Sequence, residues 1–230
     1  MKGNFEACLK ETLRHEGGWS DHPQDRGGAT MKGVTIGVYA QWKGRKVTKD
    51  ELRAISDAEV AAIYRRNYWD KVRGDELPRG LDLVAFDAAV NSGPTRSAKW
   101  LQSSVGAAAD GKIGPDTIHA ASRAPIKASI MVACETRRRF LRGLREWPTF
   151  GKGWMRRVAD VEAAALRMAE AAVDAPAAPA PQTAPISQPQ GRYVDSHIGP
   201  PRPGTSFSPR EGWLVSLFRA VWAAISKRKY

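Results

Sequence analysis

The sequence contains few cysteines and few histidines for its size. Two cysteines, Cys8 and Cys134, occur in 230 residues, which excludes a disulfide-rich scaffold and a thiolate metal site. Each cysteine falls on the apolar stripe of a predicted helix, so we expect two buried thiols. The four histidines lack the paired spacing of zinc ligands. The sequence therefore implies no metal and no cofactor.

Acidic residues are outnumbered by basic ones. The chain holds 36 Lys and Arg against 24 Asp and Glu, a formal charge of +12. This excess predicts attraction to a polyanion, which could be nucleic acid, an anionic membrane face or an acidic envelope polymer. Because no helix-turn-helix or RNA-binding motif accompanies the charge, we do not expect a specific nucleic-acid partner.

The composition changes sharply near Asp174. Nine prolines occur among the 36 residues of 175–210, which predicts an extended, flexible linker without a core. The chain before it is 174 residues long, enough for one packed domain. We therefore expect one folded domain over 1–174, then the linker, then a terminal segment over 211–230.

The folded part shows mainly helical periodicity. Gly17 and Gly18 end the first predicted helix, and a capping box of Ser56 and Glu59 begins another. The predicted helices cover about 3–15, the segment from 56 onward, the apolar segment ending at Gly93, about 125–146 and about 154–173. Glycines and alternating residues between 19 and 47 predict a small hairpin or loop. Without a repeated βαβ pattern, the expected fold class is mainly α.

Two carboxylates lie in the glycine-rich stretch RHEGGWSDHPQDRGGATMKG, residues 14–33. Glu16 is expected in the last turn of a helix, whose negative end would raise its pKa, and burial beside Trp19 would add to the shift. Asp25 lies in a polar loop that favours its ionised form. Two carboxyl groups with separated pKa values suit glycosidic-bond cleavage, and Thr30 could hold the water. The alternative is a helix end with a solvated acid followed by an ordinary turn.

The run HEGGWSDHPQDRGGATMKGVT resembles the signature of glycoside hydrolase family 108, the N-acetylmuramidases found as phage endolysins and as bacterial secretion-associated muramidases. The resemblance implies a lysozyme-like helical fold with Glu16 as the catalytic acid. Glu16, Asp25 and Thr30 also resemble the catalytic trio of phage-type lysozymes, with one residue fewer between the last two, which implies catalytic roles for all three. The sequence departs from the family pattern at Ala29, where Pro is usual, and at Met31, where Asn is usual.

The resemblance continues along the chain, through YRRNYWDKVRGDELPRGLDLVAFDAAVNSGP to KWLQSSVGAAADGKIGPDTIHAA. The first of these is similar to the family's central helix and completes the catalytic region 1–95. The second resembles its peptidoglycan-binding-like half, which we assign to 96–174. By its residues alone, DGKIGPDT within it is a tight turn that leads into a helix.

The activity that the resemblance implies is hydrolysis of peptidoglycan at the β-1,4 bond between N-acetylmuramic acid and N-acetylglucosamine, which lyses the bacterial cell. Peptidoglycan glycan strands are then the partner, and a monomer is expected. The first residues, MKGNFEACLKETLRHEGG, show no secretory signal. We therefore expect a bacteriophage endolysin made in the host cytoplasm that acts on the wall in the periplasm. The alternative is a catalytically inactive peptidoglycan-binding or membrane-tethering module.

Aromatic and amide side chains are candidates for sugar binding. Tyr39 and Trp42 lie beside the glycine-rich segment, Trp69 is a further candidate, and Asn91 lies at the exit of the buried helix. Their alternatives are core packing for the aromatic residues, most of all Trp69, and helix capping for Asn91. The arginine-rich run over 137–145 is expected to form a solvated helix face.

The terminal segment 211–230 reads as an amphipathic basic helix. One face gathers large apolar residues and the end is cationic, which is typical of helices that lie in a membrane interface. We expect it to bind an anionic inner- or outer-membrane lipid surface, which vesicle sedimentation of the full chain can test; docking on the domain or spanning a bilayer are the alternatives. The contact candidates are Trp213, Leu217, Phe218, Trp222, Lys227, Arg228 and Lys229.

Overall fold

The structure, a computed structural model, describes residues 3–21 and 28–173. Asp25, the predicted linker 175–210 and the predicted membrane-binding segment 211–230 lie outside the described residues. Within the described part, no helix has the length and apolar character needed to cross a bilayer.

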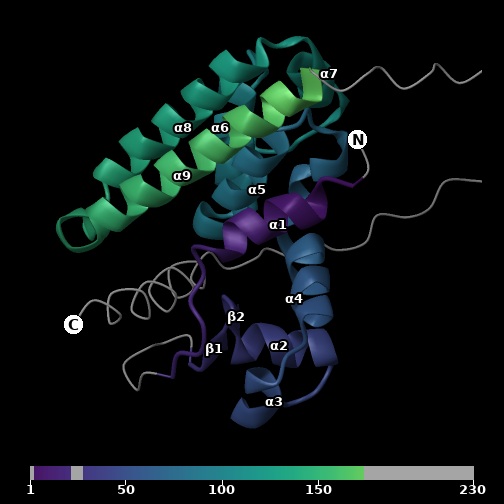
Figure 1. Ribbon diagram of the computed structural model, residues 1–230, viewed down its shortest axis with the longest axis vertical. Helices are drawn as coiled ribbons and strands as arrows, with labels where there is room; N and C mark the ends of the chain where they lie inside the picture. The colour runs from purple at the N-terminus through teal and green to yellow at the C-terminus, as the bar shows by residue number, and fades with distance from the viewer. Residues whose placement is uncertain (1–2, 22–27, 174–230) are drawn as a thin grey trace, which may run out of the picture.

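The described chain is mainly helical, which confirms the expected fold class (Figure 1). A π-helical turn over Arg65–Trp69 and two 3-10 turns, Asp70–Val72 and Gly74–Glu76, follow the fourth helix. The helices are α1 (Phe5–Leu13), α2 (Ile36–Lys43), α3 (Lys49–Arg53), α4 (Asp57–Tyr64), α5 (Leu81–Ser92), α6 (Pro94–Ser104), α7 (Pro115–Arg123), α8 (Ile126–Arg142) and α9 (Trp147–Val173).

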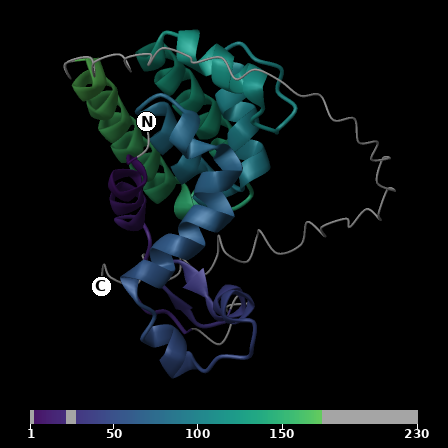
Figure 2. The same cartoon turned by 90° about the vertical axis from the view of Figure 1, so that its right-hand side faces the viewer.

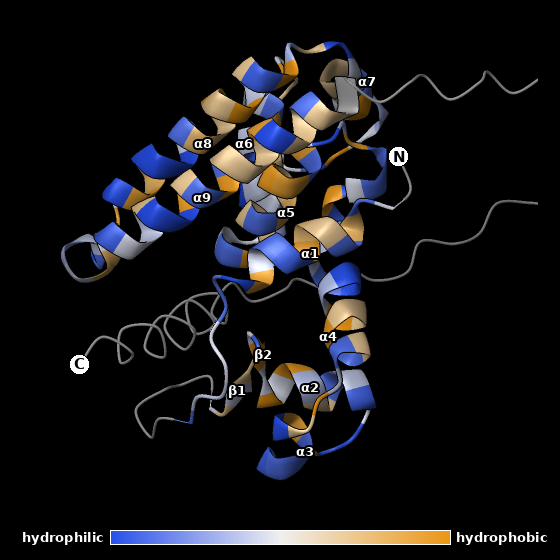
Figure 3. Cartoon of the chain, in the orientation of Figure 1, coloured by the Kyte–Doolittle hydropathy of each residue, from blue (hydrophilic) through white to orange (hydrophobic). Residues whose placement is uncertain are grey.

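The elements form two groups joined by α4. Helices α5, α6, α8 and α9 pack together with α1, while α2, α3 and the hairpin form a smaller group at the other end of α4 (Figures 1 and 2). Helix α5 contacts α1, α6, α8 and α9, and ten of its twelve residues are buried. The apolar segment ending at Gly93 is therefore the central buried helix, as predicted. The surrounding helices alternate between apolar and polar residues along their length (Figure 3), and their buried apolar residues form one core cluster with those of α5.

The small hairpin that the sequence predicted is present. Strands β1 (Thr30–Met31) and β2 (Val34–Thr35) pair antiparallel, and the two turn residues, Lys32 and Gly33, have φ values of 48° and 76°. Positive φ at both positions is typical of a type I′ turn. The alternating residues after Thr35 form α2, because the Thr35 hydroxyl accepts from the Val38 amide and caps a helix there.

Several predicted helix boundaries shift. Helix α1 ends at Leu13, and the Glu16 amide donates to the Leu13 carbonyl in the following turn. Glu16 therefore follows the helix instead of lying in its last turn. Helix α8 ends at Arg142, before the predicted end, and α9 begins at Trp147, before the predicted start. The Ser56–Glu59 capping box is present as predicted.

Both cysteines are buried free thiols, as predicted. Cys8 lies on α1 and Cys134 on α8. Burial raises the pKa of the Cys134 thiol to about 12 and that of Cys8 further. Neither thiol is therefore activated as a nucleophile at neutral pH.

The segment between α6 and α7 is a well-anchored turn. The Gln102 amide nitrogen donates to Asp110 Oδ1 at 2.7 Å and to the Lys112 carbonyl at 3.0 Å, and the Gly111 amide donates back to Gln102 Oε1 at 2.9 Å. Gln102 is 1% exposed, so one buried amide fixes the turn. These contacts agree with the structural interpretation of DGKIGPDT.

Candidate active site

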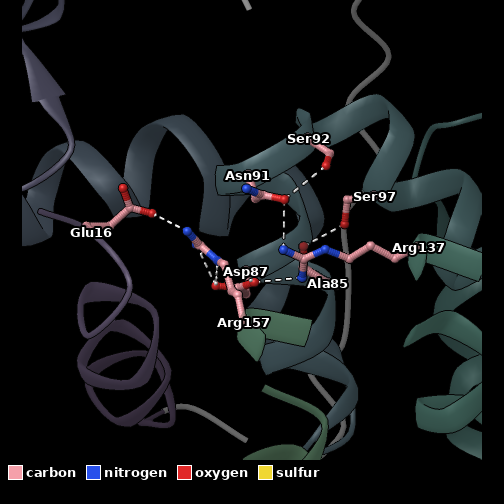
Figure 4. A network of polar contacts seen from close by, with 8 residues as sticks. All are labelled: Glu16, Ala85, Asp87, Asn91, Ser92, Ser97, Arg137 and Arg157. Carbon is pink, nitrogen blue, oxygen red and sulfur yellow. Dashed lines mark hydrogen bonds and ion pairs between the residues drawn. The ribbon is translucent and has the colours of Figure 1, made fainter. Parts of the chain in front are cut away.

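The Glu16 carboxyl lies between the two groups of elements, in the segment that joins α1 to the hairpin. Its side chain is 3% exposed, and Arg157 Nη1 of α9 donates to its Oε1 at 2.8 Å (Figure 4). The expected burial is present. The sequence did not predict the cation, which comes from the far end of the folded chain.

Arg157 is also bound to Asp87 of α5. Arg157 Nη2 donates to Asp87 Oδ1 at 2.7 Å, and Arg157 Nε lies 3.1 and 3.2 Å from the two Asp87 oxygens. On the other side, Arg137 Nη1 of α8 donates to Asp87 Oδ2 at 2.7 Å. Asp87 thus holds two buried guanidinium groups, one of which reaches Glu16 (Figure 4). Buried charges are tolerated when they are paired in this way.

Asn91 lies at the edge of this network. Arg137 Nη2 donates to Asn91 Oδ1 at 2.9 Å, and the Ser92 hydroxyl donates to the same oxygen at 3.3 Å. The Asn91 side chain therefore orients Arg137, a role that neither sequence alternative anticipated. Sugar binding by Asn91 stays a prediction.

The second Glu16 oxygen faces the hairpin turn. A Cβ at Gly33 would lie 2.9 Å from Glu16 Oε2 and closer still to the Tyr64 hydroxyl. That hydroxyl donates to the Lys32 carbonyl at 3.0 Å, which ties α4 to the turn. Glycine at 33 therefore serves both the positive φ of the turn and the close approach of the acid.

The surroundings of Glu16 and Asp87 shift the pKa values of these two acids in opposite directions. Burial raises the pKa of Glu16, while the adjacent Arg157 opposes that rise. Burial alone would also raise the pKa of Asp87, but Arg157 and Arg137 hold it well below its usual range. Glu16 can therefore carry a proton under conditions where Asp87 stays ionised. Burial, more than a helix end, is what favours the neutral form of Glu16.

Two neighbours of the acid also have shifted pKa values. Burial lowers the pKa of His15, and Arg157 adds to that effect. Burial and the Glu16 charge raise the pKa of Tyr68 to about 12. Both side chains are therefore expected to be neutral near pH 7.

The other two catalytic candidates stay predictions. Thr30 is 2% exposed, its backbone pairs with Ser20, and its hydroxyl donates to the Gly28 carbonyl at 3.3 Å. Asp25 lies outside the described residues.

The aromatic candidates lie in different environments. Trp69 is 0% exposed and packs on Phe5 and Phe86 in the core, so the substrate-binding prediction for Trp69 is wrong in this structure. Tyr39 is 3% exposed and donates to Glu59 at 3.1 Å, which also makes it a core residue and corrects the second prediction. Both rings fit the apolar interior better than a sugar face. Trp42 is half-buried, and its role stays a prediction.

Sequence reasoning missed the network around Glu16. The arginine-rich run was expected to face solvent, yet Arg137 is 2% exposed and bound to Asp87. Arg157 was not singled out at all. Asp87, one of two acids inside the mainly apolar helix α5, was the signal, because a buried carboxylate needs a cation or donors.

Within residues 3–21 and 28–173, no group of three or more His, Cys, Asp or Glu side chains could hold a metal ion. The side chains gathered at Glu16 are instead two acids, two arginines and an amide.

Comparison with known proteins identifies relatives of the chain. The model of the family described as glycosyl hydrolase 108 matches residues 9–93. Among solved structures, SagA of Brucella abortus is 43% identical with a TM-score of 0.66, over 74% of this chain and 97% of that one. No curated protein matches this chain. Glu16 and Asp87 lie inside the matched region 9–93, whereas Arg137 and Arg157 lie beyond it.

Proposed function

Because the chain belongs to glycosyl hydrolase family 108, a family of peptidoglycan hydrolases, we propose that it is an N-acetylmuramidase with Glu16 as its general acid. The observation that carries the proposal is the placement of the Glu16 carboxyl. It is buried, held at one oxygen by Arg157, and set against Gly33 at the other.

The proposed reaction breaks the bond between N-acetylmuramic acid and the next N-acetylglucosamine. Glu16 gives its proton to the glycosidic oxygen as that bond breaks, and positive charge develops on the muramic acid ring. Water then adds to the ring carbon and gives its proton to a carboxylate, which is Asp25 if that residue activates the water and otherwise the ionised Glu16. Asp25 is proposed to activate this water or to stabilise the positive ring, with Thr30 orienting the water.

The environment of Glu16 supports the first step. A general acid must hold its proton near the working pH, and burial raises the pKa of Glu16 toward that range. The Arg157 contact to Oε1 fixes the carboxyl orientation. Oε2, on the hairpin side, is the oxygen we propose as the proton donor.

The proposed setting is cell lysis by an endolysin. Degradation of the wall by a muramidase would lyse the bacterium once the enzyme reaches the periplasm. The net charge of +12 favours adsorption to anionic envelope polymers and lipids. Glycan strands are the proposed substrate, and a monomer is sufficient because all the residues named act within one chain.

A turbidity assay on permeabilised Gram-negative cells tests the proposal. Glu16→Gln removes the proton that the reaction needs, so we expect lysis to slow by about 10²- to 10⁴-fold. The control is Glu11→Gln, which changes an acid on α1 that pairs with Arg14 away from the network. If the wild type and E16Q lyse cells equally, or if neither protein lyses them, the result would favour the catalytically inactive wall-binding module.

A further inference from the structure

Asp87 has more contact with Arg157 than Glu16 has. The Nε and Nη2 atoms of Arg157 bind the Asp87 carboxylate, which leaves Nη1 for Glu16. A guanidinium that binds a carboxylate through two nitrogens is held more strongly than one that binds through a single nitrogen. The guanidinium is therefore oriented chiefly by Asp87, and its position toward Glu16 follows from that.

Asp87 is itself fixed from the opposite side. Its side chain is 0% exposed, and Arg137, which is 2% exposed, binds the carboxylate and the amide oxygen of Asn91. The cluster therefore contains two cations and, when Glu16 is protonated, one anion. Without the Asp87 charge, two buried guanidinium groups would lie near Glu16, Arg157 in contact with it and Arg137 farther away, with no other anion among the network residues.

We propose that Asp87 is a positioning residue for Glu16 that acts through Arg157: it holds the guanidinium in place and offsets its charge, so that Glu16 can carry a proton. The inference rests on the proposed function, in which Glu16 must be protonated to act. It also assigns a role to α8 and α9, whose arginines complete the environment of the acid.

The charged and titratable groups near Glu16 come from each element packed around it. His15 and the two tyrosines are expected to be neutral near pH 7, so the charges that control the protonation of Glu16 are those of the two arginines and Asp87. The groups are Arg157 of α9, Asp87 of α5, Arg137 of α8, Tyr64 of α4, Tyr68 of the π-helical turn and the adjacent His15.

Two substitutions in this network should have opposite effects. Asp87→Asn removes an anion and leaves both cations, which stabilises ionised Glu16. The basic limb of the pH–rate profile should then move to lower pH by about one unit or more. Arg157→Gln removes the cation that contacts Glu16, so the same limb should move to higher pH.

The first measurement is the pH dependence of peptidoglycan hydrolysis. The second is an NMR titration of the Glu16 carboxyl, whose signal is identified by its absence in E16Q. Asp82→Asn is the matched control. Asp82 is a buried acid on the same helix, but it binds Asn4 and the amides of Gly80 and Leu83 rather than an arginine. We expect D82N to leave both the pH–rate profile and the Glu16 titration unchanged.

The proposal would be overturned if D87N left both the basic limb of the pH–rate profile and the Glu16 titration unchanged. It would also be overturned if D87N and R157Q shifted them in the same direction. If D87N does not fold, Arg137→Gln tests the same network, because weaker neutralisation of Asp87 should shift the titration upward. If the wild type cleaves no peptidoglycan, the proposed function fails, whereas the carboxyl titration still decides the role of Asp87.

Discussion

The two oxygens of Glu16 have different neighbours, and this asymmetry is the central feature at the scale of residues. Oε1 accepts from Arg157 and Oε2 faces Gly33. One oxygen therefore fixes the side chain, and the other is the proposed proton donor. A glycosidase acid needs both a defined orientation and a raised pKa.

Gly33→Ala tests the close approach of the hairpin turn. An Ala side chain would be strained at φ 76° and would press on the Tyr64 hydroxyl and Glu16 Oε2. We expect the free energy of unfolding to fall by about 1–3 kcal/mol and hydrolysis to slow. Urea unfolding and the lysis assay measure the two effects.

Gly37→Ala is the control for this substitution. Gly37 lies in α2 with open space around the added Cβ, so the change should be neutral or stabilise by about 0.5–1 kcal/mol. Equal stability and activity of G33A and the wild type would show that the turn does not constrain the acid.

At this scale the sequence predicted the acid but not its partners. The glycines after Glu16 made it conspicuous, and its burial is as expected. Arg157 lies 141 positions away, and no local pattern pairs residues at such separation. Trp69 and Tyr39 were misassigned because an aromatic side chain has the same local pattern in a core as in a sugar site.

At the scale of elements, α5 carries two buried acids whose environments differ. Asp82 is bound by neutral donors, and burial raises its pKa to about 6. Asp87 is bound by two arginines, which hold its pKa low. Ionisation of Asp82 therefore opposes folding, whereas ionisation of Asp87 supports it.

Denaturant unfolding of D82N and D87N between pH 3 and pH 7 should separate these two contributions. Asp87 stabilises above the unfolded-state pKa of about 4, so the cost of D87N should be about 3–5 kcal/mol near neutrality and should shrink below that pH. Asp82 contributes fully to the free energy of unfolding below about pH 4, and this contribution is lost as the pH rises through about 6. The cost of D82N should therefore shrink toward neutral pH. Parallel pH profiles for the two variants would contradict this account.

The elements themselves were largely predictable. Periodicity and the capping box located most helices, and the apolar run ending at Gly93 identified the central one. The segment after Thr35 was one exception, because its alternation of apolar residues suits a strand while the Thr35 cap begins a helix, and periodicity did not identify α3 or α6 either. Side-chain capping at Thr35 outweighs the alternating pattern.

At the scale of the whole molecule, the two predicted halves share one site. Residues of 1–95 supply Glu16 and Asp87, while α8 and α9 of 96–174 supply Arg137 and Arg157. The second half was expected to resemble a peptidoglycan-binding unit, and its contact with the acid gives it a further role in the proposed reaction. Composition alone could not reveal this, because it separates the chain only at the linker.

In the proposed reaction, Glu16 delivers a proton during hydrolysis of the muramic acid bond. Mass spectrometry of the fragments that the full chain releases from purified peptidoglycan tests this most directly. We expect the wild type to release fragments with N-acetylmuramic acid at the reducing end, and E16Q to release almost none. Fragments that end in an anhydro sugar, or equal release by E16Q, would contradict the account.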